Sequence, residues 1–239
     1  HPNILGAYLA IGMLVCAMAL SRAREKWQWV VLLVASQIML VGLFLTFSRN
    51  AWLAVIVAGV AWLAIDFFSR LKRGEGEGQA SRFLVEPIHL MLLVSVVVAG
   101  IMSFYFFDEV KGRVGIEPSR IERQSLDERV SLVSRAIPLV HDVWYRGSGI
   151  GNFTTTLFQF EEKRGVDREW YTYQPLHKVL LMIFAELGLL GLIVVLVMTF
   201  FIIRIAPVSV YPLLFSLGAL SLFDHFLWTL QQGRFMFWM

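Results

Sequence analysis

The stretch KVLLMIFAELGLLGLIVVLVMTFFII, residues 178–203, decides the fold class of this chain. Only two of its side chains are charged, Lys178 and Glu186. The hydrocarbon core of a bilayer is roughly 30 Å thick, and a helix that rises about 1.5 Å per residue crosses it in about 20 residues. The stretch therefore predicts a transmembrane helix.

Five further apolar stretches are found in the 239-residue sequence, at residues 4–20, 27–47, 51–68, 86–107 and 207–230. Each is continuously apolar, whereas the strands of a transmembrane β-barrel alternate with a period of two. We therefore expect an all-α protein, a polytopic transmembrane helical bundle with about six spans. Because the chain begins with His1 rather than Met, we interpret it as a fragment of a larger bundle.

The charged residues are concentrated in one region. Hydrophobic residues make up 57% of the chain and charged residues 16%, against about 45–50% and 25% in soluble domains. Residues 108–176 carry 21 of the 39 formal charges. This excludes a soluble globular enzyme, and we expect membrane lipids but no nucleic acid as partners. The regions predicted are transmembrane helices 1–4 over 1–107, a large loop over 108–176, and transmembrane helices 5–6 over 177–239.

The short loops predict the orientation in the membrane. Lys and Arg gather in the loops 21–26, 69–85 and 204–206, which marks that side as cytoplasmic. The large loop is then extracytoplasmic. Within it, apolar residues recur every three or four positions, which predicts a short amphipathic helix over about 127–145. The Gly-rich stretch 74–81 predicts a flexible cytoplasmic loop.

Several arginines on the extracytoplasmic side admit two interpretations each. Arg49, in the turn TFSRNAW, either extends toward a lipid headgroup or binds a phosphate or pyrophosphate through its planar, bidentate guanidinium. Arg129, Arg135 and Arg146 either belong to a solvated helix face or clamp an anion. The run GSGIGN at 147–152 either ends the helix or cradles a phosphate with its amides.

Four ionisable residues in or beside the apolar stretches also need an explanation. His177 is either an interfacial residue or a general base, because its charge changes near neutral pH. Glu186 falls near the middle of a span, so it must be paired, protonated or in a cavity. Asp224 and His225 are adjacent within residues 207–230, and we expect both to face the interior of the bundle.

Five segments, in this order, resemble motifs of the O-antigen ligase and O-antigen polymerase superfamily of bacterial membrane glycosyltransferases. They are HPNILGAYL (1–9), LTFSRNAWLA (45–54), ERVSLVSRAIPLVHDVWYRGSGIGNF (128–153), HKVLLMIFAELGLLG (177–191) and DHFLWTLQQGRFMFW (224–238). The resemblance implies glycan transfer from an undecaprenyl-pyrophosphate-linked donor to a glycan, lipid A core or protein acceptor. It also implies a multi-pass protein of the bacterial inner (plasma) membrane, acting on the periplasmic face in lipopolysaccharide and polysaccharide biosynthesis of the cell envelope.

The resemblance further implies roles for individual residues. His177 would be the catalytic base or would orient the acceptor, and Arg49 and Arg129 would hold the donor pyrophosphate. Further substrate-binding residues are expected at Arg135, Arg146, Lys178, His1 and Asn3. The superfamily works without a metal or another cofactor, and a single displacement predicts inversion at the anomeric carbon.

Two other functions remain open on the sequence. A transporter or flippase for a lipid-linked or anionic solute would use Glu186, Asp224 and His225 as intramembrane coupling-ion or substrate sites. A scaffold or sensor would keep the bundle without catalysis. The motifs also leave open whether a transferase would act as a ligase or as a polymerase.

Overall fold

The computed structural model describes residues 1–73, 87–115, 120–231 and 233–234, and these form helices and connecting segments without strands. Five of the described helices are long and apolar enough to cross a membrane. They are α1 (Pro2–Leu20), α2 (Lys26–Leu45), α3 (Arg49–Arg73), α5 (Pro87–Tyr105) and α9 (Val179–Ile205). The prediction of an all-α bundle with several potential membrane spans is confirmed. The Gly-rich stretch 74–81 lies outside the described residues.

The chain divides into two compact units. The first comprises His1–Glu117 with Ala206–Leu220, and the second comprises Pro118–Ile205 with Ser221–Met239.

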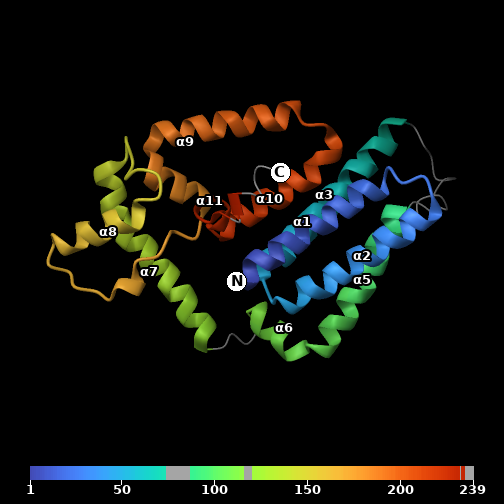
Figure 1. The fold of residues 1–239 in the computed structure, drawn as a ribbon, viewed down its shortest axis with the longest axis horizontal. Helices are drawn as coiled ribbons and strands as arrows, with labels where there is room; N and C mark the ends of the chain where they lie inside the picture. Colours follow the sequence, from blue (N-terminus) through green and yellow to red (C-terminus); the bar gives the residue numbers. More distant parts are fainter. Residues whose placement is uncertain (74–86, 116–119, 232, 235–239) are drawn as a thin grey trace. The chain divides into compact units, whose positions relative to one another are not determined.

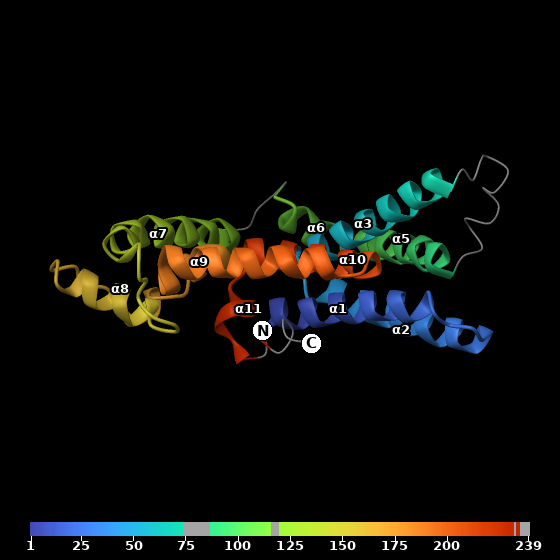
Figure 2. The same cartoon turned by 90° about the horizontal axis from the view of Figure 1, so that it is seen from above.

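In the first unit, α1 packs against α2 and α3, and α2 packs against α5. Helices α1 and α2 lie side by side in both views (Figures 1 and 2). Small and medium side chains such as Ala10 and Leu43 fill the space between the helices, while large apolar side chains such as Val96 are exposed. Apolar surface of this kind suits a lipid environment, where association between helices depends on close packing.

The turn between α2 and α3 is held by its own hydroxyl groups. Thr46 Oγ1 donates to the Leu43 carbonyl at 2.6 Å, and Ser48 Oγ accepts from the Ala51 amide at 3.4 Å. Gly6 of α1 lies so close to this turn that an added Cβ would be 2.9 Å from the Ala51 Cβ. The N-terminal part of α1 therefore lies beside the start of α3. The short helix α6 (Phe107–Arg113) belongs to the same unit.

The second unit contains the charged region. Its elements are α7 (Arg120–Val143), α8 (Phe153–Glu162), the 3-10 turn η2 (Trp170–Thr172), α9 and α11 (Phe226–Thr229). The amphipathic helix predicted over 127–145 is present as α7, which starts seven residues earlier. Its buried residues Leu132, Ala136 and Leu139 form a core with Phe153 and Leu157 of α8.

Helix α9 is broken at Gly188, where φ is 67° and ψ is −168°. Figure 1 shows its two parts meeting at an angle. The loop after α7 fills the break: the Leu189 amide donates to the Trp144 carbonyl at 2.8 Å, and the Ser148 amide donates to the Ala185 carbonyl at 2.9 Å. These bonds satisfy main-chain groups that a continuous helix would pair internally. The single helix predicted over 178–203 is therefore wrong in this respect.

A second interruption divides the last predicted span, residues 207–230. It comprises η3 (Val208–Val210), α10 (Tyr211–Phe223) and α11. Between α10 and α11, the Asp224 carboxylate accepts a hydrogen bond from the His225 amide at 2.8 Å. The polar pair therefore sits at a helix break, not on the face of a continuous helix.

Candidate functional site

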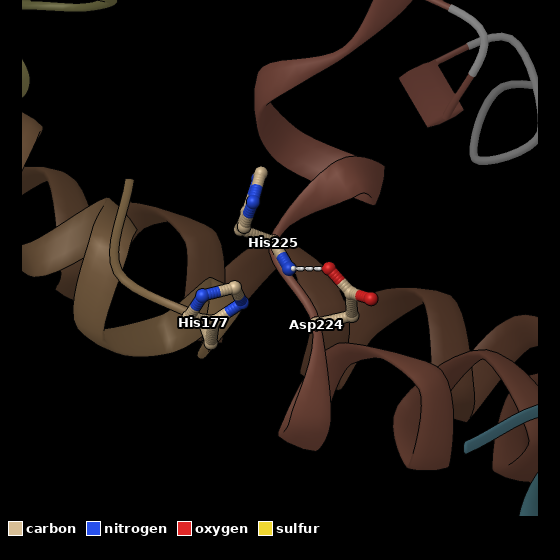
Figure 3. Close-up of side chains that lie close together, drawn as sticks. All are labelled: His177, Asp224 and His225. Carbon is tan, nitrogen blue, oxygen red and sulfur yellow. Dashed lines mark hydrogen bonds between the residues drawn. The ribbon is translucent and has the colours of Figure 1, made fainter. Parts of the chain in front are cut away.

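Three side chains of the second unit meet at two non-helical points of the chain (Figure 3). His177 comes from the segment that leads into α9, and Asp224 and His225 come from the junction of α10 and α11. Their potential ligand atoms lie within 4.8 Å of one another. The centroids of the two imidazole rings are 5.2 Å apart. The sequence pointed to all three residues, but it did not predict that they meet.

His177 has a buried nitrogen that is available for chemistry. Its Nδ1 atom is buried and has no hydrogen-bond partner among the described residues. The preceding residue, Leu176, is fully buried in the core of the unit and holds the backbone in place. Because an unpaired buried polar atom is costly, it marks a position where a ligand or reacting group can bind.

His225 is held in place by Thr229. The Thr229 hydroxyl donates to the His225 carbonyl at 3.2 Å, and its oxygen contacts the His225 Nδ1 atom. Both contacts link the His225 residue to the last residue of α11, so the position of the ring follows that of this helix.

Arg129 of α7 acts electrostatically on His177. Burial, with the positive charge of Arg129 as the next cause, lowers the pKa of His177 from 6.5 to about 4. The His177 imidazole is therefore neutral at neutral pH and lies in the field of a fixed cation. Of the loop arginines considered from the sequence, Arg129 is the one that affects His177 in this way.

Arg135 has protein partners for its guanidinium. Its Nε and Nη2 atoms each donate to a Glu161 oxygen at 2.8 Å, and Nη1 donates to the Thr172 carbonyl at 3.3 Å. The guanidinium also lies over the Tyr173 ring. The bond from Arg135 holds the pKa of Glu161 below its usual range. Arg135 therefore joins α7 to α8 and to the segment that leads to His177, a role that no sequence spacing suggested.

The other predicted substrate-binding residues of this unit, Arg146 and Lys178, are exposed. The run 147–152 forms part of the loop that fills the break in α9. The amides of Ser148 and Gly149 donate to carbonyl groups of α9, both at 2.9 Å. Of the two interpretations of this run, the structure supports a helix stop that docks against α9, because these amides are already engaged.

Glu186 is 2% exposed, and its Oε2 atom accepts a hydrogen bond from Trp228 Nε1 at 2.8 Å. Pairing was one of the three states expected for a carboxylate at this depth. The partner is an indole 42 residues away, and nothing in the sequence predicted this pairing.

The remaining predicted residues, Arg49, His1 and Asn3, belong to the first unit. Arg49 is exposed at the start of α3, and its Nη1 atom donates to the Arg113 carbonyl at 3.3 Å. His1 caps α1, since its Nδ1 atom accepts from the Asn3 amide at 3.3 Å. Arg49 therefore places a cation at the N-terminus of α3, where the helix dipole is also positive. The charge of Arg49 and the dipole of α3 both favour the binding of an anion there.

The His177, Asp224 and His225 cluster contains zinc-type ligands, two imidazole nitrogens and a carboxylate oxygen. With metal–ligand distances of about 2.0–2.2 Å, tetrahedral ligands lie about 3.4 Å apart. A spread of up to 4.8 Å is wider than this, so the side chains would have to move to hold an ion. Metal-independent action stays a prediction.

An apolar cavity of about 300 Å³ lies within the second unit. Val179 and Ile183 line it from the first part of α9, Val195 and Met198 from the second part, and Leu227 from α11. The break at Gly188 lets both parts of one helix face this space. Two of its lining residues lie close in sequence to the cluster: Val179 is two residues from His177, and Leu227 is two residues from His225.

Together, the long apolar helices and the polar cluster at helix breaks define a multi-pass membrane protein with a candidate reaction centre. Residues 34–196 match the family model described as O-antigen ligase. This match covers more than half of the chain, so the chain belongs to the O-antigen ligase family. The resemblance noted in the sequence is thereby confirmed. No curated protein and no solved structure matches the chain.

Proposed function

We propose that the chain transfers a glycan from a lipid-pyrophosphate donor, of the undecaprenyl type, to an acceptor hydroxyl at the cluster around His177. Membership of the O-antigen ligase family supports glycosyl transfer in general. The observation that carries the specific proposal is the buried His177 Nδ1 atom, which lacks a protein partner among the described residues and lies in the field of Arg129.

In the proposed reaction, the acceptor hydroxyl attacks the anomeric carbon while His177 Nδ1 takes its proton. The bond between that carbon and the pyrophosphate oxygen breaks, and the lipid pyrophosphate leaves with the electron pair. Arg129 stabilises the charge that develops on the leaving group. A single displacement inverts the anomeric carbon. The low pKa of His177 keeps its base form available at neutral pH, and the negative pyrophosphate raises its basicity when bound.

The apolar cavity of the second unit supports a lipid-linked donor. A prenyl chain requires an apolar space near the site where its pyrophosphate binds, and Val179 and Leu227, each two residues from a histidine of the cluster, line the cavity. Donor binding would then combine apolar burial with a charge contact to Arg129.

We propose Arg49 as a second anion contact for the donor or for a lipid headgroup. Its support is its exposure at the N-terminal end of α3, where the helix dipole also favours an anion. Replacing Arg49 with Lys keeps the charge but removes the bidentate fork, so transfer should fall several-fold if the contact is bidentate. Normal transfer by Arg49→Lys would make Arg49 an interfacial anchor only.

The test uses the full-length protein in lipid vesicles with an undecaprenyl-pyrophosphate glycan as donor. His177→Ala should reduce both transfer and release of undecaprenyl pyrophosphate by about 10²–10⁴-fold, the usual contribution of a positioned base. His141→Ala, at an exposed histidine of α7, is the matched control and should keep wild-type rates. Wild-type rates in His177→Ala would refute the base role. The size distribution of products would distinguish a polymerase from a ligase.

Transport of a lipid-linked or anionic solute is the second candidate, favoured by the two helix breaks at Gly188 and at Asp224–His225. Broken helices often surround substrate and ion sites in transporters. In vesicles, a transporter would move the lipid-linked glycan across the bilayer without releasing pyrophosphate. Movement without release would therefore favour this second function.

A further inference from the structure

We propose that Glu186 is a positioning residue: its hydrogen bond to Trp228 fixes α11 and so holds His225 beside His177. This inference rests on the proposed function, because it assigns Glu186 a supporting role in the same site. Among the described residues, the side chain of Glu186 hydrogen-bonds to neither histidine. It accepts a hydrogen bond from the indole of Trp228, at 2.8 Å.

The position of the Glu186 carboxylate is determined by the break in α9. Two residues after Glu186, Gly188 leaves the helical conformation. The Glu186 carbonyl accepts from the Gly149 amide at 2.9 Å, and the Ala185 carbonyl accepts from both the amide and the hydroxyl of Ser148. The main chain at Glu186 is thus bonded to the loop that follows α7. Because the backbone at Glu186 is constrained in this way, the Glu186 side chain can hold another helix in a defined position.

The helix that Glu186 holds in position is α11. It has four residues, Phe226–Thr229, which is too short to be stable alone. Phe226 and Leu227 are buried and give α11 apolar contacts, but apolar contacts have little directionality. The Trp228 indole packs against the core that contains Met182 and directs its single N–H group to Glu186. This bond is a directional contact between α11 and α9, in addition to the bond that Arg234 donates to the Trp228 carbonyl at 2.8 Å.

His225 immediately precedes α11 and also bonds to it through Thr229. A change in the rotation or position of α11 therefore moves His225, and it moves Asp224 through the bond between the Asp224 carboxylate and the His225 amide. His177 lies in the segment before the first part of α9, the same part that carries Glu186. The bond between Glu186 and Trp228 thus connects the two segments that form the cluster.

A carboxylate is a strong acceptor for an indole N–H group, but it is costly to bury at membrane depth. If Glu186 acts only as an acceptor, the neutral amide of Gln can replace it, because its carbonyl oxygen accepts the same bond. If Glu186 instead transfers a proton, Gln cannot replace it. This difference separates a positioning residue from a group that takes part in the chemistry.

The experiment compares Glu186→Gln, Glu186→Leu, Trp228→Phe and the double variant Glu186→Leu/Trp228→Phe in the full-length protein. We expect Glu186→Gln to retain at least half of wild-type kcat. Glu186→Leu and Trp228→Phe should each lower kcat tenfold or more, because small misplacements of reacting groups are costly. The double variant should be no worse than the worse single variant, since both changes remove one interaction. Trp170→Phe, at an exposed indole, is the matched control and should be silent.

A second measurement does not depend on activity. Histidine-labelled protein is titrated by NMR in wild type, Glu186→Gln, Trp228→Phe and the control. His225 and Asp224 contribute to the pKa of His177, so the His177 titration midpoint should shift in Trp228→Phe and stay unchanged in Glu186→Gln. An unchanged midpoint and wild-type kcat in Trp228→Phe would overturn the proposal. Loss of activity in Glu186→Gln equal to that in Glu186→Leu would also overturn it. If wild type transfers no glycan but the midpoints shift as expected, the proposed function fails and the positioning role survives.

Discussion

At the scale of single residues, the protonation of His177 predicts a pH dependence. Its pKa lies at about 4 in the fold and at 6.5 when unperturbed. Since the base is the neutral form, kcat/KM, which reports on the free enzyme, should be level from about pH 6 to pH 8 and fall toward pH 4. The same shift means that the unfolded chain takes up a proton before the folded one, so this contribution to stability decreases as the pH falls below 6.5.

Replacing Arg129 with Gln tests the cause of this shift. The loss of its positive charge should raise the pKa of His177, so the acid limb of the kcat/KM profile should move to higher pH. Arg146→Gln changes an exposed arginine of the same unit and should leave the limb in place. An identical displacement in both variants would show that general surface charge, not Arg129, controls His177.

The pair formed by Arg135 and Glu161 predicts an effect on stability. The side chains are 12% and 9% exposed, and breaking a buried pair by removing one partner costs about 3–5 kcal/mol. Arg135→Ala should therefore lower the Tm in detergent clearly, whereas Arg123→Ala, at an exposed position of α7, should not. Because the pKa of Glu161 is lowered, this stabilisation is present above the usual pKa of a glutamate and is lost as the pH falls through its folded value. A raised KM for the donor with an unchanged Tm would instead support a substrate-binding role for Arg135.

At the scale of elements, the close approach between the loop after α7 and the break in α9 predicts that one glycine of this loop cannot be replaced. Gly147 has φ +70°, and an added Cβ would overlap the Glu186 carbonyl. Gly151 has φ +75°, but its Cβ would meet open space. Both Ala variants carry the strain of a left-handed residue, about 1–2 kcal/mol, and Gly147→Ala carries the overlap in addition. We expect a larger fall in Tm and a loss of transfer for Gly147→Ala; equal effects would show that the loop does not need this close approach.

At the scale of the whole molecule, the charge distribution predicts the topology. In a Cys16→Ser background, a cysteine at His141 should react with an impermeant thiol reagent from the extracytoplasmic side. A cysteine at Arg24 should react only after the membrane is permeabilised, because positive residues in its short loop predict that this loop is cytoplasmic. Both positions accept a label: His141 is exposed, and Arg24 lies in the exposed turn between α1 and α2. The reverse labelling pattern would place the cluster on the cytoplasmic side and exclude the proposed reaction there.

The whole protein also permits a test of metal dependence. If His177 acts as a free base, transfer should continue at the wild-type rate after treatment with EDTA and removal of the chelator. Loss of activity that is restored by a divalent cation would instead assign His177, Asp224 and His225 to a metal centre.

The sequence by itself determined the all-α class, the positions of five long apolar helices, the amphipathic helix α7 and the family. These follow from local signals, since apolar length sets a span and a period near 3.6 sets a helix face. It also pointed to His177, Arg129, Asp224 and His225 as separate polar residues that required explanation.

Only the tertiary structure decided how these residues combine. It placed His177 with Asp224 and His225, assigned Arg135 to Glu161, and paired Glu186 with Trp228. It also broke α9 at Gly188, where a loop 37 to 45 residues earlier in the chain supplies the hydrogen bonds that make the break tolerable. The physical reason is that a helix break and a buried polar pair depend on partners remote in sequence, and local composition contains no record of them.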